Sequence, residues 1–259
     1  MNLIDRAADV LCHARHAVAL TGAGVSTHSG IPDFRTPGSG MWEQADPLEV
    51  ASVFAFRRKP EAFFNWIRPL ARLLIAAQPN PAHVALAQLE TAGILKTIIT
   101  QNIDGLQQRA GSRRVLEVHG HLRECTCVRC YRVFPTEQFV ETFLSEGGVP
   151  RCPGCGNVLK PNVILYGEQL PAVAMQAAQR ETRQCDAMLI AGSSLEVAPV
   201  SELPRFAQRS GARLVLVNLQ PTYLDEQVDV MICDDVAEVL PQIVQACGAP
   251  SQNGRADPD

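Results

Sequence analysis

The stretch that decides the fold is Thr21–Arg35, TGAGVSTHSGIPDFR. It follows the apolar run Ala17–Leu20, which is typical of a buried strand. Gly22 and Gly24 allow a tight turn and a close approach of the backbone to a ligand. Ser26 is a typical cap of a following helix, whose free N–H groups would face an anion. The stretch therefore predicts a phosphate cradle, although a strand, turn and helix without a ligand fit it equally well.

The glycine pattern departs from that of an ordinary dinucleotide-binding turn. It is Gly22-x-Gly24-x-x-Thr27, without the third glycine, and no acidic residue ends a second strand at the usual distance. An ordinary nicotinamide dehydrogenase is therefore disfavoured. The stretch ends instead in Pro32–Arg35, an unusual cluster of an acid, an aromatic ring and a base.

Composition narrows the class of protein. The chain has 259 residues, of which 46% are hydrophobic and 19% charged, enough for one large domain or one domain with an insertion. The net charge of -4 argues against the basic face that general nucleic-acid binding needs. We find no apolar run of membrane-spanning length and no secretory signal, so we expect a cytoplasmic protein.

Apolar segments alternate between strand-like and helix-like patterns over most of the chain. Strands are expected at 17–20, 94–100, 115–118, 187–191, 213–217 and 228–233, and helices at 3–15, 47–56, 60–77, 82–92, 136–145, 171–183, 200–208 and 236–246. Strands that are apolar throughout indicate a parallel sheet covered on both faces. The aromatic residues of 47–77 are expected to pack a small helical module.

Small and polar residues follow four of these strands. They are Gln101–Gly105, Gly192–Ser194, Asn218 and the opening stretch, and His119 follows a fifth strand. Because open α/β sheets bind ligands at the carboxyl ends of their strands, these residues together favour a dinucleotide site. Taken singly, the 101–105 segment is equally typical of a plain turn, and a histidine at a strand end is more often a buried structural residue.

Two CxxC knuckles give the most specific local signal. Cys127–Cys130 and Cys152–Cys155 are separated by 21 residues, and such paired loops suit tetrahedral Zn²⁺ better than redox chemistry. Four thiolates leave no open coordination position, so we expect a structural metal; Cys125 lacks the spacing. The remaining cysteines, which we expect to be small buried residues without disulfides, are Cys12, Cys185, Cys233 and Cys247.

Several of these motifs occur in one order that resembles the sirtuin family of NAD-dependent protein deacylases, particularly its bacterial and archaeal branch. They are GAGVSTHSGIPDFR, TQNIDGL, the His119–Gly120 pair, the two knuckles, PNVILYGE and GSSLEVAPV. The resemblance covers essentially Leu3–Ala246.

The resemblance implies a sirtuin catalytic domain over 1–248. Its large Rossmann-like part would comprise about 1–35, 80–120 and 166–248. A smaller inserted domain would comprise the helical insert 36–79 and the zinc module 121–165, with one structural Zn²⁺. The remaining 249–259 is expected to be a disordered tail.

The implied activity is NAD-dependent removal of acyl groups from protein lysines. NAD is consumed: nicotinamide leaves, and the acyl group passes to ADP-ribose to give O-acetyl-ADP-ribose. Protein mono-ADP-ribosylation is the alternative enzyme activity. A zinc-ribbon module that binds nucleic acid is a third interpretation, but glutamates offset the arginines around the knuckles, so we expect no specific nucleic-acid binding and no membrane partner.

Site residues follow from the resemblance. His119 resembles the general base and Asn102 its catalytic partner, with His121 as the rival histidine. Cofactor contacts are implied for Gly22, Ala23, Gly24, Ser26, Asp33, Phe34, Arg35, Gln101, Asn102, Ile103, Asp104, Gly192, Ser193, Ser194, Asn218, Leu219 and Val236. Ile164, Leu165 and Tyr166 resemble the segment that pairs with the acyl-lysine peptide.

Two positions depart from family patterns. Gln107 stands where the family often has histidine, at a position to which we assign no chemistry. Members that prefer succinyl- or malonyl-lysine carry a Tyr-x-x-Arg pair, and Ile67 and Leu70 stand there in this chain. Apolar side chains cannot pair a buried carboxylate, so acetyl or longer neutral acyl groups are predicted.

Overall fold

The structure is a computed structural model that describes every residue except Met1, Arg35, Pro37, Ser39, Gln44 and 250–259. The predicted disordered tail and Arg35 therefore lie largely outside the described residues. Within these residues, every helix falls short of the length or the apolar composition that a membrane span requires.

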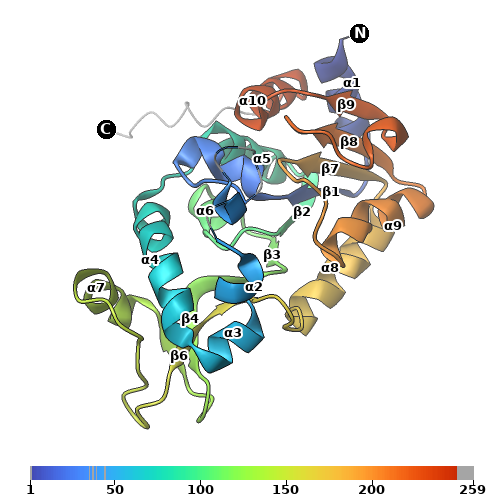
Figure 1. The fold of residues 1–259 in the computed structure, drawn as a ribbon. Coiled ribbons are helices and arrows are strands. Elements are labelled where there is room, and N and C mark those ends of the chain that lie inside the picture. Colours follow the sequence, from blue (N-terminus) through green and yellow to red (C-terminus); the bar gives the residue numbers. More distant parts are fainter. Residues whose placement is uncertain (1, 35, 37, 39, 44, 250–259) are drawn as a thin grey trace, which may run out of the picture.

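A six-stranded parallel sheet forms the larger part of the molecule (Figure 1). Its strand order is β3-β2-β1-β7-β8-β9. The strands are β1 (Ala17–Thr21), β2 (Leu95–Thr100), β3 (Val115–Glu117), β7 (Ala187–Ala191), β8 (Arg213–Val217) and β9 (Val230–Ile232). The order reverses between β1 and β7, and the carboxyl ends of strands at such a switch point are where open α/β sheets bind ligands.

Helices cover both faces of this sheet, as the fully apolar strands predict. One face packs on α1 (Leu3–Cys12), α5 (Pro81–Thr91) and α10 (Val236–Ala246), and the other on α8 (Ala172–Gln184) and α9 (Leu203–Arg209). Strands β1, β7 and β8 supply buried side chains to both cores, which confirms the Rossmann-like class.

A second group of elements lies beside the carboxyl edge of the sheet. It contains α2 (Pro47–Val50), α3 (Val53–Arg58), α4 (Pro60–Ala76) and α7 (Glu137–Ser145), together with an antiparallel sheet of order β5-β4-β6. These strands are β4 (Gly120–Cys127), β5 (Val133–Pro135) and β6 (Leu159–Val163). The short helix α6 (Leu106–Arg109) follows the end of β2. An aromatic core that includes Phe56, Phe63 and Phe64 joins α3 to α4, as expected for a helical module.

Several local predictions were wrong. The single helix expected at 47–56 is two helices, because Ser52 caps α3 and the backbone around it bonds to Tyr166. Ser26 does not cap a helix: it lies inside a 3-10 helix, Ala23–Ser29, that begins after Gly22 without a side-chain cap. The Ser26 hydroxyl bonds instead to Asn102 and Asp104, which lie far along the chain.

The scattered cysteines also differ from expectation. Cys185 is buried, as predicted, but Cys233 is exposed. Cys12 and Cys247 are paired as a disulfide, with Cα atoms 6.2 Å apart. The pair joins α1 to the end of α10, and their separation of 235 residues conceals it from any local pattern.

Candidate active site and metal centre

A pocket of about 960 Å³ lies at the carboxyl edge of the parallel sheet. Its lining comes from the strand-end loops and from the side chains of α4 and the end of β6. With Arg35 outside the described residues, all the other residues predicted to contact cofactor or substrate line it: Gly22, Ala23, Gly24, Ser26, Asp33, Phe34, Gln101, Asn102, Ile103, Asp104, His119, Ile164, Leu165, Tyr166, Gly192, Ser193, Ser194, Asn218, Leu219 and Val236.

The glycines after β1 are needed by the packing of two loops against each other. A Cβ atom on Gly22 would lie 2.7 Å from the Gly192 carbonyl oxygen, and one on Gly24 would lie 2.9 Å from it. The Gly24 N–H donates to that same oxygen over 2.9 Å. Gly192 itself has a φ of 58°, in the left-handed region. A side chain at Gly22, Gly24 or Gly192 would therefore separate the end of β1 from the end of β7.

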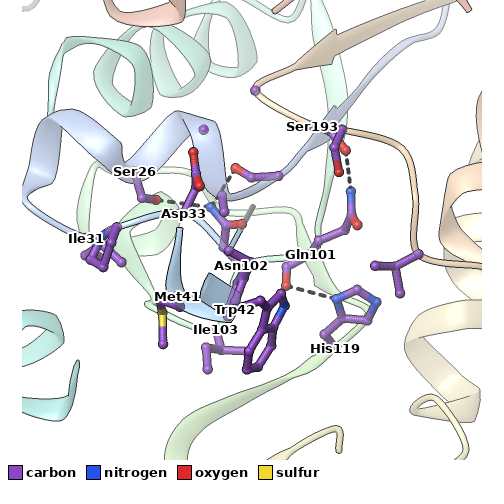
Figure 2. A pocket seen from close by; sticks show the side chains of 18 of the residues that line it. Ser26, Ile31, Asp33, Met41, Trp42, Gln101, Asn102, Ile103, His119 and Ser193 are labelled. Carbon is purple, nitrogen blue, oxygen red and sulfur yellow. Dashed lines mark hydrogen bonds between the residues drawn. The ribbon is translucent and has the colours of Figure 1, made fainter. Parts of the chain in front are cut away.

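Ser26 is buried and lies at the centre of a partly buried polar network, of which Figure 2 labels Ser26 and Asn102. Its hydroxyl donates to Asp104 Oδ2 over 2.7 Å and accepts from Asn102 Nδ2 over 3.1 Å. Asn102 Nδ2 also donates to the Gly22 carbonyl at 3.0 Å, and the Leu106 N–H donates to Asp104 Oδ1 at 2.8 Å. These bonds hold the predicted phosphate loop against the predicted ribose and nicotinamide wall, a coupling that the separate motifs do not show.

His83, which the sequence analysis missed, completes this network from α5. Its Nδ1 accepts the Asn80 N–H, so the ring proton lies on Nε2 and points to the Ser26 hydroxyl 3.3 Å away. Burial lowers the pKa of His83 to about 4, and the Asp104 carboxylate offsets only part of that effect. The ring is therefore neutral near pH 7. Its position among the alanines and leucines of α5 gives no local signal of a functional residue.

His119 has the tautomer that a general base requires. Its Nδ1 lies 3.1 Å from the Gln101 carbonyl oxygen, drawn as a dashed line in Figure 2. A carbonyl can only accept, so Nδ1 carries the proton and Nε2 keeps its lone pair. Burial lowers the pKa of His119 below 6.5, and the bond to Gln101 opposes this shift. The imidazole is therefore neutral and basic at Nε2 near neutral pH.

The rival histidine lies elsewhere. Across the described residues, His121 does not line the pocket, although it follows His119 by only two positions and lies at the start of β4. Its Nε2 lies 3.9 Å from Glu124 Oε2, and its buried Nδ1 lacks a hydrogen-bond partner among the described residues. Gly120, with a φ of 79°, turns the backbone between the two histidines.

An aromatic stack joins the loop after Gly30 to the helical module. Phe34 stacks on Trp42 with ring centroids 5.2 Å apart, and Trp42 stacks on Trp66 at 5.3 Å. The edge of Tyr166 also meets Trp42, at 6.1 Å. Asp33 closes this loop by accepting bonds from the N–H and hydroxyl of Thr36. Trp42 and Trp66 thus line the pocket in addition to the predicted residues.

One end of the pocket is lined by apolar side chains of α4. Ile67 and Leu70, the positions compared with the Tyr-x-x-Arg pair, both line it and are each 5% exposed. Other apolar side chains continue this surface, namely Ile31, Phe63, Trp66 and Leu74. An uncompensated carboxylate placed against this surface would lose its hydration without gaining a partner.

The segment predicted to pair with peptide already uses much of its main chain. The Ile164 N–H donates to the His119 carbonyl, and the Tyr166 N–H and C=O bond to Ala51 and Val53. The Leu165 N–H donates to Glu168 Oε2 over 2.9 Å. Side-chain packing is therefore the main interaction left to this segment. The pocket continues along 167–168, Leu170 and 196–198, which the sequence analysis did not single out.

Gln107 is 1% exposed, and neither atom of its side-chain amide has a hydrogen-bond partner among the described residues. It lies on α6, directly after the polar strand end, but does not line the pocket. The structure therefore assigns it no contact in the site.

The four knuckle cysteines converge on one centre. Their sulfur atoms all lie within 4.8 Å of one another, with Cys127 and Cys155 at 3.4 Å and Cys130 and Cys152 at 3.7 Å. Tetrahedral Zn–S bonds of about 2.3 Å place sulfurs about 3.8 Å apart, so this donor set fits Zn²⁺. Cys125 lies outside the cluster and its thiol bonds to the Phe134 carbonyl. The centre is structural, because four thiolates complete the coordination sphere.

Comparison with known proteins identifies the family. The model of the Sir2 family matches residues 22–199. NAD-dependent protein deacylase 2 of Archaeoglobus fulgidus is 47% identical over 93% of this chain and 95% of its own length. The NAD-dependent protein deacetylase of Sulfurisphaera tokodaii is 42% identical over 93% and 94%. The chain therefore belongs to the Sir2 family.

Solved structures agree. A Sir2 structure with a deacetylated p53 peptide and 3′-O-acetyl-ADP-ribose has a TM-score of 0.90 and 38% identity, covering 95% of this chain and 99% of the other. A structure of Sir2Af2 with a myristoylated histone peptide has a TM-score of 0.81 and 42% identity, covering 95% and 96%.

Proposed function

We infer that this Sir2-family chain is an NAD-dependent protein-lysine deacylase that converts NAD and an acyl-lysine into nicotinamide, free lysine and O-acyl-ADP-ribose. One observation carries the proposal: a neutral histidine, basic at Nε2, shares one pocket with a glycine-rich strand-end loop and an apolar channel. Relatives named as NAD-dependent deacylases and deacetylases support it.

The chemistry begins at the bond between nicotinamide and ribose. An amide oxygen is a weak nucleophile, so the acyl oxygen of the lysine attacks the ribose carbon only as nicotinamide leaves with the bonding electrons. We propose that His119 Nε2 then takes the proton of a ribose hydroxyl. The oxygen left behind takes the proton of the neighbouring hydroxyl as that hydroxyl attacks the imidate carbon. The lysine nitrogen then leaves as the free amine with the proton that the histidine returns, and water hydrolyses the remaining cyclic acyl intermediate to O-acyl-ADP-ribose. Each step uses only NAD, the acyl-lysine and water.

The buried network would hold the cofactor for this reaction. We propose that the 3-10 helix start at Gly22–Gly24 binds the phosphates and that Asn102 and Asp104 bind the ribose and carboxamide side. Gly192, Ser193 and Asn218 would contact adenosine. Because Ser26 bonds to both Asn102 and Asp104, the phosphate loop and the reacting end are oriented together. Such fixed geometry lowers the entropic part of a barrier.

The apolar end of the pocket supports a preference for neutral acyl groups, including long ones. Ile67 and Leu70 line it at the positions where a carboxylate-binding pair would stand. A 42% identical structural relative holds a myristoylated histone peptide, which supports room for long chains in this family. We therefore propose that succinyl- and malonyl-lysine are poor substrates of this chain.

The division into parts proposed from the sequence is compatible with the two sheets. We propose that 1–35, 80–120 and 166–248 form the NAD-binding part and that 36–79 and 121–165 form the smaller one. We also propose a cytoplasmic location.

One assay tests the function. The zinc-loaded protein is incubated with acetyl-, myristoyl- and succinyl-lysine peptides, with and without NAD, and nicotinamide and peptide masses are measured. We expect NAD-dependent loss of the neutral acyl groups, one nicotinamide per lysine released, and O-acyl-ADP-ribose. A protein that gains the mass of ADP-ribose while the acyl-lysine stays intact would instead identify a mono-ADP-ribosyltransferase.

A further inference from the structure

His28 lies in the 3-10 helix Ala23–Ser29, beside the residues predicted to bind phosphate. Its side chain is 46% exposed, and its Nε2 atom lies 2.6 Å from Oδ2 of Asp235, a residue 207 positions further along the chain. An ionised carboxylate only accepts hydrogen bonds, so Nε2 carries the proton and donates. The bond therefore joins the phosphate loop to the residue that precedes α10.

Asp235, the acceptor of this bond, directly precedes Val236, and both residues line the active-site pocket. Its Oδ1 accepts the Ala237 N–H over 2.8 Å and so caps α10. Its Oδ2 accepts from His28. Each oxygen of the carboxylate thus has a partner within the protein, and together these contacts fix the start of α10 at the wall of the pocket.

The charge of the pocket makes this bond important for an anionic cofactor. Among the described residues of the lining, carboxylates are present and lysine and arginine are absent. The carboxylates are those of Asp33, Asp104, Glu168, Glu196 and Asp235. Each phosphate of NAD carries a negative charge, so an unpaired carboxylate in the same pocket opposes binding. His28 supplies a donor to Asp235, as Lys160 does to Glu168 over 2.9 Å.

Other contacts hold the 3-10 helix in place without His28. Asn80 Nδ2 donates to the Val25 carbonyl over 2.8 Å and to the Ser29 hydroxyl over 3.0 Å. Val25 also packs in the same buried core as Val236. Loss of the His28 side chain should therefore leave the protein folded and change only how closely the phosphate loop and the start of α10 are held together.

We propose that His28 is a positioning residue for the cofactor: its bond to Asp235 holds the start of α10 against the phosphate loop and so sets the affinity for the adenosine diphosphate part of NAD. The inference rests on the NAD-dependent function proposed above. It implies that loss of the bond weakens NAD binding, while binding of the acyl-lysine peptide and the chemical steps are unaffected.

The experiment measures the Kd of ADP-ribose by calorimetry and the steady-state constants of the zinc-loaded protein with NAD and an acetyl-lysine peptide. For His28→Ala, we expect the ADP-ribose Kd and the KM for NAD to rise about fivefold, which corresponds to the upper end of the range for an exposed ion pair. The KM for the peptide and kcat at saturating NAD should stay at the wild-type values. His28→Gln, whose amide can still donate, should recover most of the affinity.

Two further variants test the partner and provide the control. Asp235→Asn keeps an oxygen that can cap α10 but removes the negative charge. In that background, His28→Ala should change the ADP-ribose Kd by less than about twofold, because no carboxylate is left unpaired. His13→Ala is the matched control, since His13 Nδ1 lies 3.1 Å from Asp9 Oδ1 in an exposed pair that lies outside the described pocket lining. It should match the wild type in every constant.

The outcomes separate the two proposals. A wild type that binds ADP-ribose but leaves the acetyl group in place refutes the function, and the ADP-ribose Kd values of the variants still decide the role of His28. If His28→Ala leaves that Kd unchanged, or raises it equally in the Asp235→Asn background, the positioning role is overturned while the function stands. Equal losses in kcat and in both KM values would also overturn it, since that pattern indicates a general structural effect. A wild type that does not bind ADP-ribose would refute both.

Discussion

The two ends of the active-site pocket are built on opposite principles. At the strand ends, Ser26, Asn102, Asp104 and His83 are buried or half-buried polar groups whose hydrogen bonds fix one another. At the α4 end, apolar side chains such as Leu70 offer contact area without direction. The polar end can therefore position reacting atoms, whereas the apolar end can select only by size and charge.

This difference divides the expected effects of mutation. Removing one member of a satisfied buried network leaves its partners unpaired, a penalty that exceeds the bond itself. Changing an aliphatic side chain at the other end alters which acyl group fits but leaves the reacting geometry in place. We expect catalytic losses from the first end and changes of specificity from the second.

The largest effect is expected for His119→Ala. Loss of a general base typically costs about 10²–10⁴-fold in rate, so deacylation should fall by that amount while nicotinamide exchange is retained better. His121→Ala is the matched control and should stay near the wild type, because His121 does not line the described pocket. Initial rates on an acetyl-lysine peptide measure both. Equal losses in the two variants would contradict the assignment.

Removal of zinc should affect the apolar, α4 end of the pocket more than the polar end at the strand ends. The core around the four cysteines has few other buried side chains, so the metal supplies much of the stability of that module. The module packs on α4 through Phe64 and Phe143, whose ring centroids are 5.6 Å apart. After chelation, we expect deacylation to be lost while NAD binding, followed by calorimetry, weakens less. If deacylation and NAD binding were lost to the same degree, the two ends of the pocket would not be independent of each other.

A pair of substitutions should change acyl preference. Ile67→Tyr with Leu70→Arg supplies a hydroxyl and a guanidinium to a succinyl carboxylate, a charge-assisted interaction of about 1.5–3 kcal/mol or roughly 10–100-fold. The ratio of kcat/KM on succinyl- to acetyl-lysine peptide should rise by that factor. Leu73→Arg is the control, because Leu73 of α4 is 44% exposed, and it should leave the ratio unchanged. An unaltered ratio in the double variant would mean that the acyl group lies elsewhere.

Ser26→Ala should have a smaller effect on both activity and stability. It leaves the Asn102 amide and the His83 Nε2–H without their shared acceptor, at a cost of about 1–3 kcal/mol. We expect a melting temperature several degrees lower and about tenfold lower kcat/KM. Thr27→Ala is the control, because within the described part of the chain this hydroxyl bonds only to the Gly24 carbonyl three residues before it. Similar behaviour of the two variants would remove Ser26 from the centre of the network.

The smallest effect is on pH dependence. The pKa of His119 lies below 6.5, so the basic form persists into mildly acid solution and the acid limb of kcat/KM should fall with a midpoint below pH 6.5. Because burial lowers the pKa of His83 to about 4, the unfolded chain takes up this proton more readily than the folded chain. The stability of the fold is therefore highest above pH 6.5 and decreases between pH 6.5 and about 4. Rates and melting temperatures across pH 4–8 check both signs. An acid midpoint above 6.5 would contradict the buried, neutral His119.

Sequence patterns predicted the elements that depend on neighbouring residues. The apolar runs of β1, β2, β7 and β8 and the two CxxC knuckles were located within one or two residues. The division of 47–56 into two helices could not be predicted, since it depends on bonds to Tyr166, more than a hundred residues away. Trp42 was missed for a related reason: its place in the pocket depends on stacking with Trp66 from another element.

The sequence by itself determined the family, the parallel sheet, the strand-end residues and the four thiol ligands, because each depends on residue type and spacing along a short segment. Only the tertiary structure decided that Ser26 bonds to Asn102, Asp104 and His83, that His119 rather than His121 lines the pocket, and that Cys12 meets Cys247. These pairings join segments distant along the chain. The packing of helices on the sheet, rather than local propensity, sets which of them come within hydrogen-bonding distance.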